Sequence, residues 1–344
     1  MAIIFVEFYP KQNYNKVINI MKTLKNIAIL CSGGDVSGMN PALKRFVEYT
    51  YAKNLVPYFV KNGYEGLIDN EISQAYFKDV SGIISRGGTK IHSARSSRFI
   101  EKKYRDIAQK NLATLDIDAL IVLGGDGSFK GLDLFSKEGS IRCCGIPSTI
   151  DNDIGLTDYT LGVDTALNII KGAIDAVRDT ASSFKRAFVI ETMGRDCGYL
   201  AITSALTSGA EMCLIPEVEY DLNEYEINFK KQIKQGRNYF IAIVSESFDN
   251  AKEISDWFEN SLGFESRVTT LGHIQRGGNP SSYDRLMAYQ FITHAIDGLL
   301  DYHNNFAICY SDSHFKKEKL SDVVTTKHEL NHHLITFAKA LNQR

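Results

Sequence analysis

The sequence carries two aspartates on either side of one asparagine, directly after a run of apolar residues. Asp151 and Asp153 flank Asn152, and the apolar run covers residues 141–146. Transfer of a phosphoryl group to an alcohol needs a carboxylate that accepts the hydroxyl proton and a second acid that holds or orients magnesium. We therefore predict that Asp151 is the base and Asp153 a metal-side or electrostatic partner. An Asx-turn loop without a ligand is the alternative.

Two glycine-rich segments also follow apolar runs. Residues 32–40 contain two adjacent glycines, and residues 123–128 have the sequence Leu-Gly-Gly-Asp-Gly-Ser. Glycine lets the backbone approach a phosphate closely, and amides at a helix start favour anions. The carboxylate of Asp126, between glycines, is suited to hold Mg²⁺ beside phosphates. Neither segment has the spacing of a Walker P-loop or a Rossmann fingerprint. A tight turn, with Asp126 as a helix N-cap, is the alternative.

Several charged residues lie near other apolar runs. Arg186 opens one run and Arg195 follows it, whereas Arg267 and Arg276 lie in a later segment. A guanidinium grips a phosphate bidentately, which suits a substrate phosphate remote from the reacting hydroxyl. A surface charge is the alternative for each arginine taken alone. Glu246 ends another run, where a carboxylate needs a polar partner such as a sugar hydroxyl.

Short apolar runs alternate with helical patterns along the chain. Strands are predicted over residues 27–31, 118–123, 141–146, 187–191, 212–215, 239–245 and 267–271, and helices over residues 40–51, 162–182, 284–300 and 322–344. This alternation predicts parallel sheets covered by helices on both faces. Ligands of such sheets bind beyond the carboxyl ends of the strands, so we expect the acidic and glycine-rich segments to meet there. A length of 344 residues suits two lobes.

Composition and charge exclude several classes of protein. The content of 44% hydrophobic and 23% charged residues is that of a globular protein. A formal net charge of −2 favours neither a nucleic-acid nor a membrane partner, and the basic run at residues 315–319 is predicted to be a solvated loop. No C-x-x-C pair occurs among the six cysteines, which favours free thiols in a reducing cytoplasm. No apolar run is long enough for a membrane span. Residues 1–25 lack a signal-peptide pattern and are either a native extension or a stretch preceding a start at Met21.

Five of these segments together resemble the bacterial ATP-dependent 6-phosphofructokinases. The segments are residues 32–35, 124–128, 149–153, 193–195 and 271–278, and the similarity extends over residues 27–298. The resemblance implies an α/β fold of two Rossmann-like three-layer lobes with mostly parallel sheets and the active site in the cleft between them. It places an ATP-binding lobe at residues 26–160, a sugar-phosphate-binding lobe at residues 161–320 and a C-terminal helical segment at residues 321–344. Whether the C-terminal segment returns to the first lobe stays open.

The resemblance also implies a reaction, the phosphorylation of D-fructose 6-phosphate at its 1-hydroxyl by Mg·ATP in glycolysis. The residues that would line the ATP site are Gly34, Arg95, Ser96, Gly125, Asp126, Gly127 and Ser128, with Asp126 on Mg²⁺. The residues that would bind the sugar phosphate are Thr149, Ile150, Asp151, Arg186, Met193, Gly194, Arg195, Glu246, Arg267, His273, Ile274, Gln275 and Arg276.

Within this set the resemblance gives three residues catalytic roles. Asp151 would deprotonate the sugar hydroxyl, Thr149 would lie near the transferred phosphoryl group, and Arg195 would stabilise the charge of the transition state. Arg186 and Arg267 would reach in from a neighbouring subunit. The resemblance thus implies a cytoplasmic homotetramer whose active sites are completed by neighbouring subunits.

The phosphoryl donor depends on three positions. In the pyrophosphate-using branch of the family an Asp takes the place of Gly127 and a Lys that of Ser148. Gly127 favours ATP, because an Asp there would crowd and repel the α-phosphate of the nucleotide. Ser148 stands where ATP users usually have Gly, and Lys61 where many have a Tyr against adenine, which indicates weaker stacking or a relaxed choice of nucleotide. A pyrophosphate-dependent phosphofructokinase stays an alternative. A non-catalytic, ligand-sensing homologue is another, although the proposed base and the arginine beside it are present.

The regulatory positions of the family are partly changed. Members that bind ADP or phosphoenolpyruvate have arginines in the first helix, where this chain has Lys44 and Glu48, and a lysine where it has Gln235. Three further positions match the family: Arg86, Arg178 and Glu211. A carboxylate at Glu48 should repel a phosphorylated effector, so we predict weak or absent control by these effectors.

Overall fold

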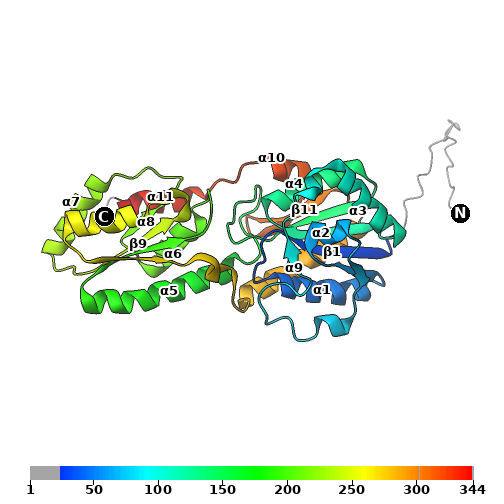
Figure 1. The fold of residues 1–344 in the computed structure, drawn as a ribbon, viewed down its shortest axis with the longest axis horizontal. Helices are drawn as coiled ribbons and strands as arrows, with labels where there is room; N and C mark the ends of the chain where they lie inside the picture. Colours follow the sequence, from blue (N-terminus) through cyan, green and yellow to red (C-terminus); the bar gives the residue numbers. More distant parts are fainter. Residues whose placement is uncertain (1–23, 302, 343–344) are drawn as a thin grey trace, which may run out of the picture.

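The computed structural model describes residues 24–301 and 303–342, arranged as two lobes along the long axis of the molecule (Figure 1). Nearly all of the predicted extension, residues 1–25, lies outside the described residues. Among the described helices, none is both long enough and apolar enough to cross a membrane.

The larger lobe is built on an eight-stranded sheet. Its strands follow the order β12 (His314–Lys319), β11 (Phe306–Ser311), β6 (Arg142–Pro147), β5 (Ala119–Gly124), β1 (Asn26–Ser32), β2 (Val56–Val60) and β3 (Ile72–Gln74), with β4 (Ser93–Ala94) beside β1. The outer pairs β2–β3 and β11–β12 are antiparallel, and the inner pairs are parallel. Along β1, Ile27 and Ile29 pack into one core layer and Ala28 and Leu30 into the other, because successive side chains of a strand point to opposite faces.

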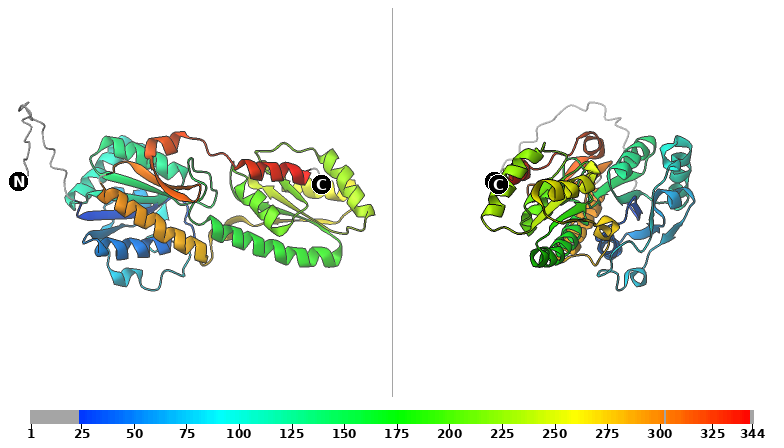
Figure 2. Two further views of the ribbon diagram at one scale, coloured as in Figure 1. Left: turned by 180° about the vertical axis from the view of Figure 1, so that it is seen from behind. Right: turned by 60° about the vertical axis from the view of Figure 1, so that its left-hand side comes forward.

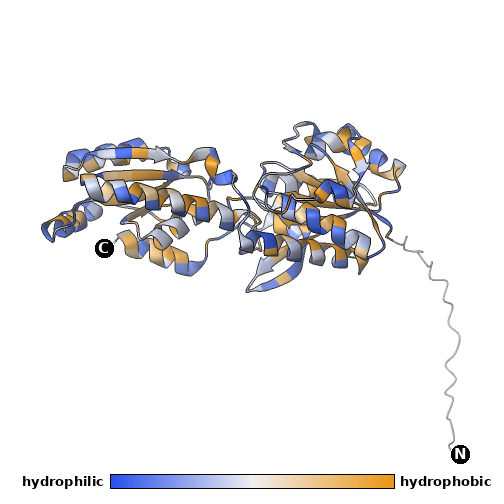
Figure 3. Ribbon diagram, turned by 90° about the horizontal axis from the view of Figure 1, so that it is seen from below, coloured by the Kyte–Doolittle hydropathy of each residue, from blue (hydrophilic) through white to orange (hydrophobic). Residues whose placement is uncertain are grey.

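Helices cover both faces of this sheet (Figure 1). One face is covered by α1 (Met39–Ala52) and α9 (Ser282–Leu300), and the other by α2 (Gly63–Ile68), α3 (Lys102–Thr114), α4 (Asp126–Glu138) and α10 (Leu320–Thr325). Hydrophobic residues gather on the strands and on the helix faces turned toward them (Figure 3). The result is a three-layer sandwich with an apolar layer on each side of the sheet.

The smaller lobe repeats this plan on four parallel strands. Their order is β10 (Ser266–Thr270), β7 (Ala187–Thr192), β9 (Phe240–Ser245) and β8 (Met212–Leu214). Core contacts join α5 (Val163–Phe184) and α6 (Tyr199–Ser208) to one face, α7 (Leu222–Lys234) and α8 (Ala251–Leu262) to the other, and α11 (His332–Asn342) to α6 and β8. Short 3₁₀ helices occur at η1 (Phe77–Val80), η2 (Arg98–Ile100), η3 (Glu246–Phe248) and η4 (Gly272–Arg276). The predicted α/β class, with two lobes and mostly parallel sheets, is confirmed.

The predicted division of the chain is corrected. Residues 161–320 do not form one lobe, because β11 pairs with β6 and β12 with β11 in the larger sheet, and α9 packs against α1. The apolar strand β11 is buried because it pairs with β6, which brings Phe306 and Ile308 into the core. Residues 306–325 therefore return to the first lobe, whereas α11, the end of the C-terminal segment, packs on the smaller lobe.

Two further predictions in this region are wrong. The single helix expected over residues 322–344 is two helices, α10 on the larger lobe and α11 on the smaller, because residues 326–331 cross between the lobes (Figure 2). Residues 315–319, expected as a solvated loop, lie in the edge strand β12. Lysines on an edge strand keep it in water and discourage pairing with another sheet, which explains a strand with so polar a sequence.

Candidate active site

The carboxyl ends of β1, β5 and β6, adjacent and parallel in the larger sheet, open into a cavity of about 350 Å³. Of the predicted site residues, those that line it are Gly34, Arg95, Ser96, Gly125, Asp126, Gly127, Ser128, Thr149, Ile150, Asp151, Arg195 and Arg276. The glycine-rich segment and the acidic segment thus share one cavity. Arg195 follows β7 of the smaller lobe, so both lobes contribute to the cavity.

Glycines bring the backbone close to this cavity at two strand ends. A Cβ at Gly124 would lie 2.5 Å from the Cβ of Ser128, so only glycine fits between the strand β5 and the first turn of α4. A Cβ at Gly34 would lie 2.4 Å from Nη1 of Arg276, so glycine at this position leaves room for the guanidinium. Helix α4 begins at Asp126 and turns its N-terminus toward the cavity, where its partial positive charge favours an anion.

Asp151 and Asp153 are the acids of the site. The side chain of Asp151 is 3% exposed, and its Oδ2 lies 3.2 Å from Nε of Arg195. Oδ1 of Asp151 and Oδ1 of Asp153 are buried and have no hydrogen-bond partner among the described residues. Because buried carboxylate oxygens are normally paired, these two oxygens are available to a ligand.

Burial dominates the titration of both acids. Desolvation raises the pKa of Asp151 above its ordinary value, although the guanidinium groups of Arg195 and Arg276 act in the opposite direction. For Asp153, burial and the neighbouring charge of Asp151 raise the pKa to about 6. Paired acids with raised pKa values are typical of catalytic sites rather than of structural ion pairs.

The acids also fit a magnesium ion that is bound together with phosphates. Asp126 lines the same cavity as Asp153, and its carboxylate accepts a hydrogen bond from Nζ of Lys130 at 2.6 Å. No group of three or more His, Cys, Asp or Glu side chains that could enclose a metal occurs in the described ranges. Mg²⁺ typically uses one or two carboxylates and takes its remaining ligands from substrate phosphates and water, which is the donor set offered here.

Glu246 holds the turn that carries Arg195. One of its carboxylate oxygens accepts hydrogen bonds from the backbone N of Gly194 at 3.2 Å and of Arg195 at 3.0 Å. The turn needs this support because both residues have positive φ, +139° at Gly194 and +52° at Arg195. Gln275 supports the same turn, since its Oε1 accepts a hydrogen bond from the backbone N of Met193 at 3.1 Å.

Comparison with known proteins identifies the family. A family model described as Phosphofructokinase matches residues 26–299. The chain belongs to the phosphofructokinase family. A relative from Sulfurimonas denitrificans named ATP-dependent 6-phosphofructokinase is 63% identical over 92% of this chain and 99% of its own length. A relative from Sulfurovum sp. with the same name is 60% identical over 92% of this chain and 97% of its own length.

Solved structures of phosphofructokinases have the same fold. A chain of the Saccharomyces cerevisiae enzyme matches with a TM-score of 0.84 and 31% identity. The match covers 93% of this chain and 47% of the yeast chain, so this chain spans about half of that protein. A pyrophosphate-dependent phosphofructokinase from Marinobacter aquaeolei matches with a TM-score of 0.79 at 19% identity, over 93% of this chain and 92% of that chain, and shows a shared fold alone.

Some residues expected at this phosphofructokinase site do not line the cavity. They are Met193, Gly194, Glu246, His273, Ile274, Gln275, Arg186 and Arg267. The first two and Glu246 belong to the turn of Arg195, and the exposed His273 and Ile274 lie on η4. Gln275 is buried, and its side-chain amide bonds to the backbone of Met193 and Gly272, so it supports the loop, while its contact with the substrate stays a prediction.

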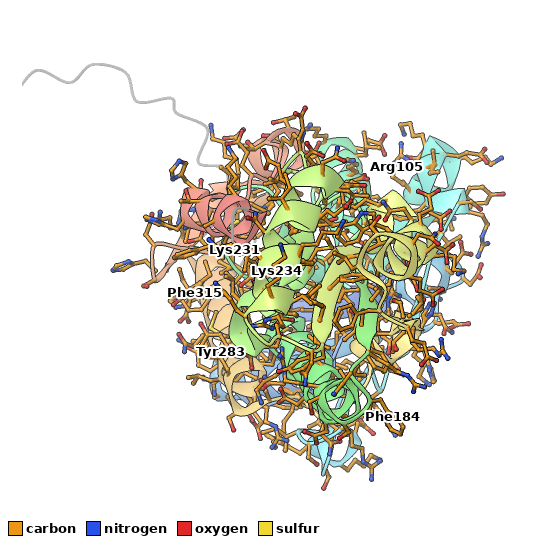
Figure 4. All side chains as sticks on the ribbon, turned by 90° about the vertical axis from the view of Figure 1, so that its left-hand side faces the viewer. Arg105, Phe184, Lys231, Lys234, Tyr283 and Phe315 are labelled. Carbon is orange, nitrogen blue, oxygen red and sulfur yellow. The ribbon has the colours of Figure 1, made fainter. Side chains whose placement is uncertain are left out.

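Arg186 and Arg267 lie at the amino ends of β7 and β10, whereas Arg195 lies beyond the carboxyl end of β7. A six-residue strand separates the two ends by about 20 Å. Both arginines pair with Glu265, and the Arg186 guanidinium lies 4.7 Å from the ring of Phe184. Phe184, labelled in Figure 4, is exposed. Within one chain the two arginines therefore do not reach the cavity.

Two residues of the cavity were missed from the sequence. Tyr64 donates a hydrogen bond from its hydroxyl to the carbonyl O of Ser128 at 2.7 Å, and its ring stacks on Phe99 at 3.9 Å. Ile100 lines the cavity and is 74% exposed. The sequence shows only an isoleucine four residues after Ser96, and its exposure is known from the structure alone. Tyr64 gave no signal either, because only the fold brings α2 to α4.

Proposed function

We propose that this chain is an ATP-dependent 6-phosphofructokinase that phosphorylates the 1-hydroxyl of D-fructose 6-phosphate, giving fructose 1,6-bisphosphate and ADP. The observation that carries the proposal is the meeting of Asp151 and Arg195 across the cavity that the loop of Gly125 lines. Relatives named ATP-dependent 6-phosphofructokinase at 63% and 60% identity support the substrate and the donor.

Asp151 is the proposed general base. Its unpartnered Oδ1 is the oxygen that accepts the proton of the sugar hydroxyl as the hydroxyl oxygen attacks the terminal phosphorus of ATP. Arg195 orients Oδ2 and places positive charge where the transferred group gathers negative charge. Arg276, which lies against Gly34, adds a second cation on the same side and suits the phosphate of the sugar.

The nucleotide is proposed to bind along the glycine-rich strand ends. Gly34, Arg95, Ser96 and the residues from Gly125 to Ser128 line this part of the cavity. Asp126 and Asp153 would hold Mg²⁺ together with the phosphates, and the ion when bound neutralises charge on the transferred group. The exposed Ile100 offers an apolar surface to the adenine ring of the nucleotide. It would take the place of the aromatic side chain that many family members have at the position of Lys61.

ATP is favoured over pyrophosphate as the donor. A Cβ at Gly127 would meet nothing within 4 Å, so the protein itself leaves this space open for a nucleotide phosphate. Ser148 is buried and its hydroxyl donates to the carbonyl O of Ile146 at 3.0 Å, so it adds no charge to the site. A non-catalytic homologue is disfavoured because the base and its arginine are both in place.

Assembly and location follow from the same proposal. The position of Arg186 and Arg267 at the far end of the smaller sheet supports a homotetramer in which these side chains complete the sugar-phosphate site of a neighbouring subunit. All six cysteines are buried free thiols, which supports a reducing cytoplasm.

A donor comparison tests the function. Purified protein is assayed with fructose 6-phosphate and either Mg·ATP or Mg·pyrophosphate, alongside Asp151→Ala and the exposed α5 variant Asp175→Asn as a matched control. We expect turnover with ATP, a loss of about 10²–10⁴-fold in Asp151→Ala and no change in the control. Faster turnover with pyrophosphate would overturn the donor assignment, and near-normal turnover of Asp151→Ala would overturn the assignment of the base.

A further inference from the structure

The loop that carries the acids rests on the C-terminal crossover between the lobes. A Cβ at Gly155 would lie 2.3 Å from the carbonyl O of Thr326, so this crossover touches the backbone two residues after Asp153. Ile154 between them is buried in the same core cluster as Val323 of α10. The crossover lies beyond residues 26–299, which the family model matches.

His328 of the crossover makes the polar contact. Its Nδ1 lies 3.1 Å from the carbonyl O of Ile154. Because a carbonyl accepts only, Nδ1 carries the hydrogen and donates it. The other ring nitrogen, Nε2, is buried and has no hydrogen-bond partner within the described part of the chain. Within the described residues the ring therefore makes one hydrogen bond, and its acceptor is the carbonyl O of the residue that follows Asp153.

The remainder of this loop is tied to the returning strand β11. The backbone N of Tyr310 donates to the hydroxyl oxygen of Thr157 at 3.0 Å, and the backbone N of Asp158 donates to the carbonyl O of Tyr310 at 2.8 Å. On the N-terminal side of the acids, the hydroxyl of Thr160 donates to the carbonyl O of Thr149 at 2.5 Å. Among the described residues of the C-terminal part of the chain, His328 therefore makes the hydrogen bond that lies nearest in sequence to Asp153.

We propose that His328 is a positioning residue for phosphoryl transfer, which clamps the Asp151–Asp153 loop through the carbonyl O of Ile154, with Gly155 allowing the crossover to approach. The role rests on the proposed function of Asp151. The acids themselves give the loop little restraint, since their Oδ1 atoms are unpartnered in the described residues and Arg195 belongs to the other lobe. A displacement of about 1 Å at a reacting group costs up to about 100-fold in rate, so a single backbone clamp is enough to affect turnover.

Two variants of His328 separate the clamp from general packing. Asparagine places its amide nitrogen near the position of Nδ1, whereas glutamine places it near that of Nε2. We expect His328→Asn to keep kcat within about threefold, whereas kcat of His328→Gln should fall by about tenfold or more. The KM values for fructose 6-phosphate and ATP and the melting temperature should be close in the two variants. Hydrogen exchange of the amides in residues 150–156 should be faster in the Gln variant only.

Gly155→Ala supplies an independent test, with Gly172→Ala as its control. A Cβ at Gly172 on α5 would meet nothing within 4 Å, so its substitution should leave kcat unchanged, whereas Gly155→Ala should lower it. Equal kcat and equal hydrogen exchange in the Asn and Gln variants would overturn the proposal. A fall in kcat that is explained by a matching fall in the melting temperature would overturn it as well. Asp151→Ala is assayed in parallel. If Asp151→Ala stays active, the assignment of Asp151 as the base is wrong. Hydrogen exchange in residues 150–156 still tests whether His328 holds the loop.

Discussion

Nε of Arg195 lies 3.2 Å from Oδ2 of Asp151, so an arginine of the smaller lobe meets the proposed base of the larger lobe. The two side chains differ in exposure, 53% for Arg195 and 3% for Asp151. A buried carboxyl group is therefore paired with a guanidinium that water still reaches. Movement of one lobe against the other would change both the pKa of the base and the charge that faces the transferred phosphoryl group.

Arg195→Gln should lower kcat by about 10²–10³-fold, because it removes a cation that faces charge developing in the transition state. The same substitution should move the acid limb of the pH profile of kcat/KM to higher pH. The guanidinium lowers the pKa of Asp151, so its loss raises that pKa and leaves more of the base protonated at a given pH. Lys252→Gln, on the exposed face of α8, is the control. An unmoved acid limb would show that Arg195 does not act on the base.

Asp153→Asn should stabilise the protein at neutral pH while lowering its activity. The pKa of Asp153 in the folded protein, about 6, lies above its ordinary value, so the folded state loses stability as the pH rises through 6. At pH 7.5 the variant should gain on the order of 3 kcal/mol in the free energy of unfolding. Below the ordinary pKa of this carboxyl group, 3.8, Asp153 is protonated in both the folded and the unfolded state, so most of the gain should be lost at pH 3. Thermal unfolding at pH 3 and 7.5 measures this, and a gain independent of pH would contradict the burial of a charge.

Gly127→Asp should weaken the use of ATP without harming the fold. Open space surrounds the Cβ position, and an Asp in the first turn of α4 complements the helix dipole. Its charge would face a nucleotide phosphate, so kcat/KM for ATP should fall by about tenfold or more. The same change at exposed Gly172 is the matched control. Undiminished kcat/KM for ATP would contradict the placement of the phosphates beside Gly127.

ADP and phosphoenolpyruvate should have little effect on activity. The carboxylate of Glu48 pairs with Lys44 and accepts a hydrogen bond from the hydroxyl of Tyr289 at 3.2 Å, so its charge is held in place on α1. Because neither effector is expected to bind one conformation of the protein much better than another, ADP or phosphoenolpyruvate should change the rate at low fructose 6-phosphate by less than about twofold. Glu48→Gln should increase this sensitivity. Strong cooperative activation of the unmodified protein by ADP would refute the prediction.

Much of the site was predictable because its parts are local. Strand ends, glycine turns and the acids at Asp151 and Asp153 are set by apolar runs and their flanking residues, and parallel strands bring such ends to one edge. The shared cavity of Gly125 and Asp151 follows from this rule. The sequence pattern alone therefore determined the α/β class, the three strands β1, β5 and β6 of the larger sheet, the four strands of the smaller sheet, and the glycine-rich and acidic segments that line the cavity.

Only the tertiary structure decided which distant segments meet. The return of β11 to the larger sheet, the inward side chain of Gln275 and the contact of His328 with the carbonyl O of Ile154 join residues that no local pattern relates. Each contact joins segments that lie far apart in the sequence. Packing of this kind is set by the complementary shapes of buried surfaces, which a chain acquires only when both lobes are folded.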